Sequence, residues 1–363
     1  MAKRVIYFGP GPAVLPLQAL KQAQQDMLSL GDTGISILEH SHRGKDYGLI
    51  HEETKALLRS LFVIPESHEI LFMQGGASAQ FALVPMNFLP AGRSADYVMT
   101  GVWSQKALAE ARIVGKARVA ATTEHDGVFT RVPRQDEMAF DPDAAYVHVT
   151  SNNTIFGTQF FDLPNTGAVP LVVDMSSDLG WRPVDFSRLS LVYAGAQKNL
   201  GPAGVTLVIA RKDLLDKGRT DIPKIFRYST IAAGDSLQNT VPTFAIYMVR
   251  NVLRWVKGQG GLEAMERRNR SKAELLYRAV DARPDFYLCP VEKGSRSLMN
   301  AVFRLPSEDL EKELVAQATA RGMVGLKGHR SVGGIRVSMY NACEPADVAT
   351  LVAFLDEFAK AHA

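Results

Sequence analysis

Lys198 is the only charged residue in the segment Leu189–Ala210, where it lies in a glycine-rich loop between two apolar runs. The runs, Leu189–Ala194 and Val205–Ala210, are short and rich in β-branched residues, which is typical of strands covered on both faces. Most loop lysines point into water. An amine held against an apolar pocket, however, has a lowered pKa and can form a Schiff base with a carbonyl compound. The pattern therefore makes Lys198 a candidate for covalent chemistry.

Asp174 and Trp103 are the side chains that would let such a lysine work with a flat cofactor. Asp174 ends an apolar strand, where a carboxylate either caps the next turn through Ser176 or Ser177 or meets a cation. If that cation is a protonated ring nitrogen, the carboxylate holds the ring as an electron sink. Trp103 lies in a turn after a strand, where it is either a packing residue or a surface on which a ring stacks.

Gly75–Ser78 follows the apolar strand Glu69–Met73 and precedes a helical pattern. Its backbone N–H groups would point out from a helix N-terminus, where anions bind, although the same residues also fit an ordinary turn. The segment matches neither the Walker pattern nor GxGxxG, which weakens a nucleotide-binding interpretation. With Thr154 and Gln197 as donors to cofactor oxygens, the whole set favours a site for pyridoxal 5′-phosphate.

Strands and helices alternate along most of the chain, which predicts an α/β fold with a mainly parallel sheet and helices on both faces. In such sheets ligands bind at the carboxyl ends of the strands, so the loops after residues 73, 100, 149 and 173 should share one edge with Lys198. A bend near 258–262 predicts a boundary between a large domain, residues 16–258, and a small domain made of residues 1–15 and 259–363.

Two local expectations concern segments outside this edge. Residues 35–40 are predicted to form a short extended stretch before the SHRGK segment. The helix predicted over 261–281 carries many charges, which we expect to form a solvated face.

The chain has 363 residues, a net charge of +3 and 22% charged residues, the composition of an ordinary globular protein. So small a net charge predicts neither a nucleic-acid nor a membrane partner. No apolar stretch is long enough to span a bilayer, and the N-terminus lacks a signal-peptide pattern. The only cysteines, Cys289 and Cys343, lack metal-site spacing, so we expect no metal and a reduced, cytoplasmic setting.

Six motifs follow one another along nearly the whole chain. They are GPAVLP at 11–16, SHRGK at 41–45, GGASAQF at 75–81, YAGAQKNLGPAG at 193–204, NT-PTF at 239–244 and KGHRSVGGIRVSMYNA at 327–342. This ordered set is highly specific, and it resembles the phosphoserine aminotransferases, a family of class-V aminotransferases with the pyridoxal-phosphate fold type I. The resemblance implies a large domain with a mainly parallel, seven-stranded sheet and a smaller C-terminal α+β domain.

The resemblance implies roles for the residues around the cofactor ring. By position, Lys198 would carry the Schiff base with pyridoxal 5′-phosphate, and Asp174 would face the pyridine nitrogen. Trp103 would stack on the ring, and Thr154 would lie near the ring hydroxyl.

The resemblance also implies how the cofactor phosphate is held. Ala77, Ser78 and Gln197 would bind it within one subunit. Asn239 and Thr240 would reach the phosphate of the neighbouring subunit's cofactor, which implies a homodimer with shared active sites. Without the resemblance, Asn239 and Thr240 are a polar loop before a helix.

The family's reaction joins L-glutamate with 3-phosphohydroxypyruvate, so the site must accept carboxylates and a phosphate in turn. Arginine forks and histidines supply charge-assisted hydrogen bonds to both groups. Arg336 resembles the family's clamp for the α-carboxylate. The residues that resemble the set for the side group or phosphate, some donated across the dimer, are His42, Arg43, His329 and Arg330. Any one of these arginines alone would be interpreted as a surface charge.

Two positions depart from the family's pattern. Gly9-Pro10 stands where many members have a serine beside the N-terminal GP pair, so a contact from that side chain is lost. Ser78 stands where some members have arginine, which removes a side-chain contact to phosphate or substrate but leaves the backbone donors.

We therefore expect reversible transfer of an amino group between L-glutamate and 3-phosphohydroxypyruvate, giving O-phospho-L-serine and 2-oxoglutarate, in serine biosynthesis. Use of 4-phosphohydroxy-L-threonine in pyridoxine biosynthesis is left open. One alternative is another fold type I enzyme, such as an alanine–glyoxylate aminotransferase or a cysteine desulfurase. Others are a cofactor-binding scaffold without activity and a lysine-dependent aldolase or decarboxylase without cofactor.

Overall fold

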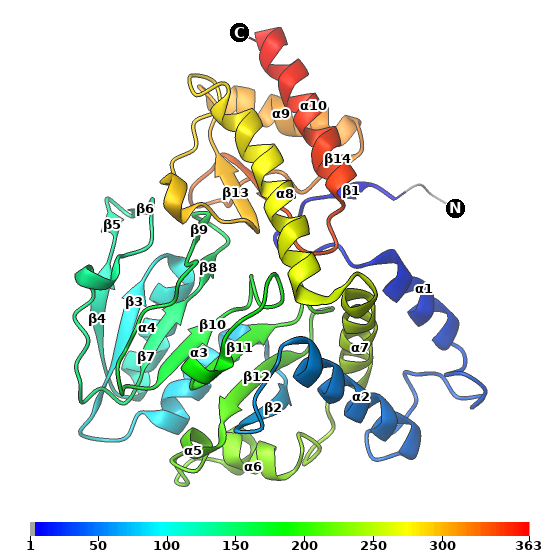
Figure 1. Cartoon of the computed structure of the whole chain (residues 1–363), viewed down its shortest axis with the longest axis vertical. Coiled ribbons are helices and arrows are strands. Elements are labelled where there is room, and N and C mark those ends of the chain that lie inside the picture. The colour runs from blue at the N-terminus through cyan, green and yellow to red at the C-terminus, as the bar shows by residue number, and fades with distance from the viewer. Residues whose placement is uncertain (1–3, 363) are drawn as a thin grey trace.

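The computed structural model describes residues 4–362, and its centre is a seven-stranded sheet (Figure 1). The strand order is β2-β12-β11-β10-β7-β3-β4. β12 is antiparallel to both of its neighbours, and every other pair in the sheet is parallel. The strands span His68–Met73 (β2), Ser94–Met99 (β3), Lys116–Thr122 (β4), Val147–Thr150 (β7), Leu171–Asp174 (β10), Leu191–Gly195 (β11) and Thr206–Arg211 (β12). The predicted α/β class and mainly parallel sheet are confirmed.

Helices cover both faces of this sheet, which explains why its central strands are apolar at successive positions. Val173 of β10 packs into the core beneath α2 and α7, whereas its neighbour Val172 packs into the core beneath α3 and α4. The helices around the sheet are α2 (Lys45–Leu61), α3 (Gly76–Phe88), α4 (Val102–Val114), α5 (Lys212–Leu215), α6 (Tyr228–Ala233) and α7 (Thr243–Gly258), and α1 (Leu17–Asp26) packs against α7.

The C-terminal third forms a second layer of helices and short strands, with its own apolar core (Figure 1). The first strand, β1 (Ile6–Tyr7), pairs in parallel with β14, and Phe8 belongs to this C-terminal core. The segment of residues 6–8 is thus held by the C-terminal layer. The elements are α8 (Gly261–Asp281), β13 (Asn300–Phe303), α9 (Glu308–Ala320), β14 (Met323–Val324), β15 (Ile335–Ser338) and α10 (Pro345–His362).

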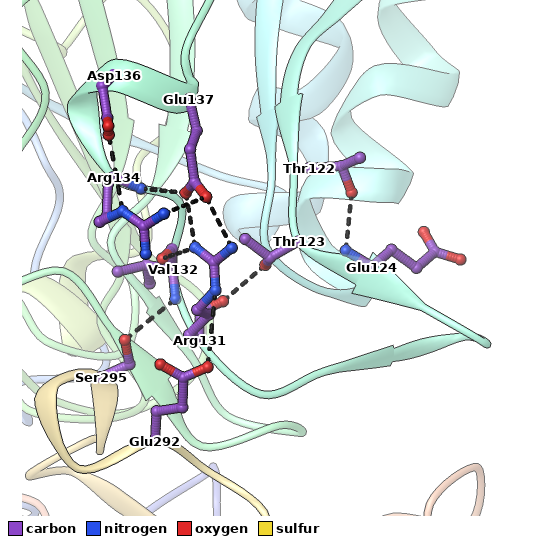
Figure 2. A network of polar contacts seen from close by, with 10 residues as sticks. All are labelled: Thr122, Thr123, Glu124, Arg131, Val132, Arg134, Asp136, Glu137, Glu292 and Ser295. Atoms are coloured by element: carbon purple, nitrogen blue, oxygen red, sulfur yellow. Dashed lines mark hydrogen bonds and ion pairs between the residues drawn. The ribbon is translucent and has the colours of Figure 1, made fainter.

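Two short hairpins lie between the sheet and this C-terminal layer. They are formed by β5 (Glu124–His125) with β6 (Val128–Phe129), and by β8 (Asn152–Asn153) with β9 (Thr158–Gln159). Figure 2 shows how the segment after β6 is joined to the C-terminal layer: Arg131 lies between Glu137 and Glu292. The Val132 N–H donates to Ser295 Oγ over 3.2 Å. The hydrogen bonds from Arg131, and after them one from the Arg134 backbone, lower the pKa of Glu137 to about 2, so its carboxylate stays charged even in mildly acidic solution.

Two local predictions are wrong. Residues 35–40 form turns instead of an extended stretch, because Ser36 Oγ accepts from the Leu38 N–H and Glu39 accepts from the Ser36 N–H. In α8, Lys272 is buried, whereas the charges of this helix were expected to be solvated. The Lys272 ammonium is tolerated there because it donates to three backbone carbonyls.

No helix in the described part of the chain is long and apolar enough to cross a membrane. Nor do residues 4–362 bring three His, Cys, Asp or Glu side chains together in a way that could hold a metal ion.

Candidate active site

A cavity of about 230 Å³ lies at the carboxyl ends of the parallel strands. It contains Lys198 together with residues from the N-terminal segment, from the loops that follow β2, β3, β7 and β10, and from the approach to β15. Its lining residues are Pro10, Gly11, Gly76, Ala77, Ser78, Phe81, Trp103, Thr150, Asn152, Thr154, Ile155, Asp174, Ser176, Ser177, Gln197, Lys198, His329 and Arg336. The sequence predicted this shared edge.

The register of the sheet fixes where the polar residues meet. Asp174, the last residue of β10, lies opposite Thr150 of β7 on one side and Tyr193 of β11 on the other. Because all three strands run in the same direction, their next residues emerge at the same edge. The loop after β11 then brings Lys198 back over this edge, next to Asp174.

Lys198 has the electrostatic properties of a reactive amine. Burial lowers its pKa to about 8, an effect that the nearby carboxylates of Asp174 and Asp178 oppose and the Arg336 guanidinium reinforces. Gly11 passes close to its side chain: a Cβ at this position would lie 3.4 Å from Lys198 Cγ. The backbone N–H of Ala13 donates to Gln197 O over 2.8 Å, which fixes the N-terminal segment against the lysine loop.

Asp174 is a buried carboxylate next to this amine. Burial raises its pKa, while hydrogen bonds from Ser176 and the charge of Lys198 act in the opposite direction. One carboxylate oxygen accepts from the Ser176 N–H over 2.9 Å. Behind it, Asp178 accepts from Ser151 Oγ over 2.5 Å, and burial raises the pKa of Asp178 to about 7.

The other predicted cofactor residues line the same cavity. Trp103 is the second residue of α4 and lies in the first turn of that helix. Its indole Nε1–H donates to Thr154 Oγ1 over 3.0 Å. Ala77 and Ser78 lie in the first turn of α3, where backbone N–H groups have no partner within the helix. Gln197 precedes the lysine directly. These positions are the ones that the sequence proposed for ring and phosphate contacts.

The residues present fit pyridoxal phosphate. The N-terminus of α3 offers donors to a phosphate, Asp174 offers a carboxylate to a ring nitrogen, and Lys198 offers an amine to an aldehyde. Two buried polar atoms on the wall, Thr150 Oγ1 and Arg336 Nε, have no hydrogen-bond partner within the described residues. Such orphaned atoms are costly unless a ligand satisfies them.

The predicted substrate residues divide into two groups. Arg336 and His329 line the cavity; Arg336 is buried and donates from Nη1 to Thr154 O over 3.0 Å. Arg330 is exposed and does not line this cavity, although it follows His329 directly. His42 and Arg43 also lie outside it.

Asn239 and Thr240 lie outside the cavity of their own chain as well. Both contact Gln74, which donates to Thr240 O over 2.7 Å and accepts from Asn239 Nδ2 over 3.3 Å. Their loop is thus tied to the residue before the α3 turn, but their side chains do not complete the site.

The sequence did not single out several wall residues. Thr150 ends β7 and Asn152 lies just beyond it, Ser176 and Ser177 follow β10, and Asp178 lies just behind them. The available signal was their place directly after a buried strand, the same signal that identified Asp174.

Three comparisons identify the family. The model of aminotransferase class-V matches residues 5–351. A phosphoserine aminotransferase of Lysinibacillus sphaericus is 50% identical over 362 residues and 100% of both chains. The solved structure of the phosphoserine aminotransferase from Bacillus circulans subsp. alkalophilus is 49% identical and covers 100% of both chains, with a TM-score of 0.97.

A third relative bears on the cofactor. The solved structure of phosphoserine aminotransferase from Trichomonas vaginalis with bound pyridoxal phosphate is 36% identical, has a TM-score of 0.93 and covers 97% of this chain and 100% of its own. Together with the match to the family model over most of the chain, these likenesses confirm the resemblance found in the motifs. The chain belongs to the class-V aminotransferases, a family of pyridoxal-phosphate enzymes with fold type I.

Proposed function

We propose that the protein is a phosphoserine aminotransferase, which transfers an amino group reversibly between L-glutamate and 3-phosphohydroxypyruvate. The products are 2-oxoglutarate and O-phospho-L-serine, which places the reaction in serine biosynthesis. The observation that carries the proposal is the pairing of Lys198 with Asp174 in a cavity that also holds Arg336. The names of relatives that are 50% identical over the full chain support the choice of substrates.

The chain's own groups have separable tasks in this reaction. Pyridoxal phosphate, when bound, supplies an electron sink that stabilises the charge left when the substrate Cα loses a proton. Lys198 holds the cofactor and then moves that proton as base and acid; a pKa of about 8 keeps part of the amine neutral near neutral pH. Asp174 would keep the ring nitrogen protonated, and Trp103 would offer its indole face to the ring.

The remaining site residues are assigned by chemistry and by their motifs. Ala77, Ser78 and Gln197 bind the cofactor phosphate, and Thr154 donates near the ring hydroxyl. Arg336 binds the α-carboxylate, an assignment supported by its burial and its unpartnered Nε. His329 faces the same cavity and contacts the substrate's anionic side group.

A second copy of the chain completes the site. His42, Arg43, Asn239 and Thr240 belong to the family's motifs but lie outside their own chain's cavity. Exposed apolar side chains precede and follow the SHRGK motif in the sequence, and Leu28, with 87% of its surface exposed, is the most exposed of them. A homodimer would cover this surface and bring these polar residues to the partner's cavity; the others of this apolar set are Ile35, Leu38 and Leu49. Arg330 joins the same substrate set when the dimer forms.

The domain division and the cellular setting belong to the same proposal. Residues 16–258 form the large domain, and residues 1–15 with 259–363 form the small one, supported by the pairing of β1 with β14. Both cysteines are free thiols, which favours the reducing cytoplasm. A role in pyridoxine biosynthesis, through 4-phosphohydroxy-L-threonine, is a second activity for the same site.

The absorbance spectrum of the purified protein tests the function. We expect a visible imine band that glutamate removes and that 3-phosphohydroxypyruvate restores. If glyoxylate restored the band and 3-phosphohydroxypyruvate did not, the alanine–glyoxylate alternative would replace the proposal. A colourless protein with full lysine-dependent activity would exclude the cofactor instead. The same assay with the keto acid of 4-phosphohydroxy-L-threonine decides the pyridoxine role.

A further inference from the structure

The loop of residues 328–334, GHRSVGG, carries His329 and Arg330 between β14 and β15. Its own hydrogen bonds give it a compact shape: the N–H groups of Val332 and Gly333 donate to His329 O over 3.0 and 2.8 Å. At its base, the Gly328 N–H donates to Gly334 O over 2.8 Å. These bonds shape the loop but do not attach its tip to the rest of the protein.

An ion pair outside the cavity makes that attachment. Arg304, which directly follows β13, donates from Nε to Glu311 Oε1 over 2.5 Å and from Nη1 to Val332 O over 2.8 Å. Glu311 lies in the first half of α9 and is buried. Its second oxygen, Oε2, accepts from the Gly334 N–H over 2.9 Å. One arginine and one carboxylate thus hold the C-terminal side of the loop, at Val332 and Gly334.

The packing of the loop on Arg304 is equally close. Gly334 has a φ of +74°, and a Cβ there would lie 2.6 Å from Arg304 Cδ and 2.9 Å from Phe303 O. No side chain fits at this position without moving Arg304 or the strand. Only glycine at position 334 therefore allows the loop to pack this closely against Arg304.

The loop has space to move if this attachment is lost. A second cavity, of about 500 Å³, adjoins the first: both are lined by Ile155, His329 and Arg336. Val332, Gly333 and Arg304 line the second cavity and not the first. The GHRSVGG loop is therefore a wall between the two spaces. On the far side Val332 also packs against the apolar cluster of Phe129 and Phe156, but the polar attachments described there are those to Arg304 and Glu311.

We propose that Arg304 and Glu311 are positioning residues that hold the GHRSVGG loop so that His329 and Arg330 meet the anionic side group of the substrate. This inference rests on the proposed function for the identity of the substrates. Neither Arg304 nor Glu311 lines the first cavity, so they act only through the loop. Their loss should weaken substrate binding while leaving the cofactor and the proton transfer intact.

The test compares Arg304→Met with Arg304→Lys, Glu311→Gln and a control, Arg321→Met. Because Arg304 is partly exposed, a methionine can occupy the same space without the guanidinium group that donates to Glu311 and Val332. Arg321 pairs with Glu357 in the same C-terminal layer, away from the loop, and its exposure is similar. For each variant we would measure KM and kcat for both substrates, the cofactor absorbance, and hydrogen exchange at residues 331–334.

For Arg304→Met we expect KM to rise about tenfold for glutamate and for 3-phosphohydroxypyruvate, with kcat within about twofold and an unchanged cofactor spectrum. Arg304→Lys and Glu311→Gln each keep part of the attachment and should fall between this variant and the unaltered enzyme. Exchange at the loop amides should become faster in Arg304→Met and stay unchanged in Arg321→Met.

Unchanged KM values and unchanged loop exchange in Arg304→Met would overturn the proposal. So would an equal rise of KM in Arg321→Met, because the effect would then come from general destabilisation. If the unaltered enzyme did not use 3-phosphohydroxypyruvate at all, the proposed function would fail separately. Hydrogen exchange at residues 331–334, which needs no substrate, would still decide whether Arg304 and Glu311 hold the loop.

Discussion

Two lysines of the protein, the buried Lys272 and the partly buried Lys198, lie in opposite surroundings. Lys272 of α8 donates to the carbonyl oxygens of Met339, Tyr340 and Cys343 over 3.0, 2.8 and 3.1 Å. Lys198 lines a cavity and has no comparable set of acceptors within residues 4–362. Burial lowers the pKa of each to about 8, so burial alone does not distinguish them.

The two ammonium groups differ in their hydrogen-bond acceptors and in the free volume around them. Lys272 uses all three N–H bonds to join a helix to the loop after β15, so its position is fixed and its task is structural. Lys198 has neighbouring charge, free volume and no fixed acceptors, so its amine can exchange partners. Arg336, with its unpartnered Nε, belongs with Lys198 in this respect. Incomplete hydrogen bonding of a buried cation is therefore the better mark of a reactive site.

The largest expected effect is that of Lys198→Ala. Without the amine that holds the cofactor and moves the proton, kcat should fall by roughly 10³-fold or more, while the protein stays folded and the imine band is lost. Lys257→Ala, at an exposed position of α7, is the matched control. Retention of full activity in Lys198→Ala would contradict both the assignment and the comparison with Lys272.

Arg336→Ala should have the next largest effect. Removing the partner of a buried carboxylate costs about 2–5 kcal/mol, which should appear as a raised KM for glutamate with the cofactor still bound. Arg278→Ala, at an exposed position of α8, should leave KM unchanged. An unchanged KM in Arg336→Ala would remove this residue from the site.

Lys272→Met should affect stability instead of chemistry. Three buried carbonyl oxygens lose their donor, so the free energy of unfolding should fall by about 3 kcal/mol, measured by urea denaturation. The folded fraction should keep its kcat and its imine band. If Lys272→Met lost the imine band while remaining folded, the distinction between a structural and a reactive lysine would fail.

The smallest effect is a pH dependence of cofactor uptake by the apoenzyme. The neutral form of Lys198 is the nucleophile, and its pKa of about 8 lies below the ordinary 10.5. The rate of imine formation should therefore rise with pH up to about 8 and level off above it, measured by stopped-flow absorbance. A rate that kept rising toward pH 10 would show that the amine has an ordinary pKa, and Lys272→Met should follow the same curve as the unaltered enzyme.

Sequence reasoning reached the centre of the site because a parallel sheet makes it predictable. Lys198 stood out as a single charge in an apolar segment, and Asp174 stood out as a carboxylate after a buried strand. Since strand ends gather at one edge, the order of the elements was enough to place both. Lys272 was missed because its helix is crowded with charges, although Met265, Asn269, Lys272 and Leu276 follow the helical period of the buried face.

The substrate residues were harder to place for a different reason. The motifs identify His42, Arg43, Asn239 and Thr240 as site residues. They do not indicate whether each residue acts in the cavity of its own subunit or in that of the partner. Their positions outside their own cavity depend on surface loops and on an interface, and neither has a periodic signal in the sequence. The support given by Arg304 and Glu311 was also invisible, because both residues lie outside the 327–342 motif in the sequence and meet it only in the fold.

The pairing of β1 with β14 has a consequence for how the protein is made. Ile6 leaves the ribosome long before Met323, and the two can pair only after Met323 has been translated. Gly11 and Ala13, which contact the lysine loop, follow β1 shortly in the chain, and at ordinary rates of translation the delay is on the order of tens of seconds. A nascent chain that already has its complete central sheet therefore still lacks one wall of its cofactor pocket.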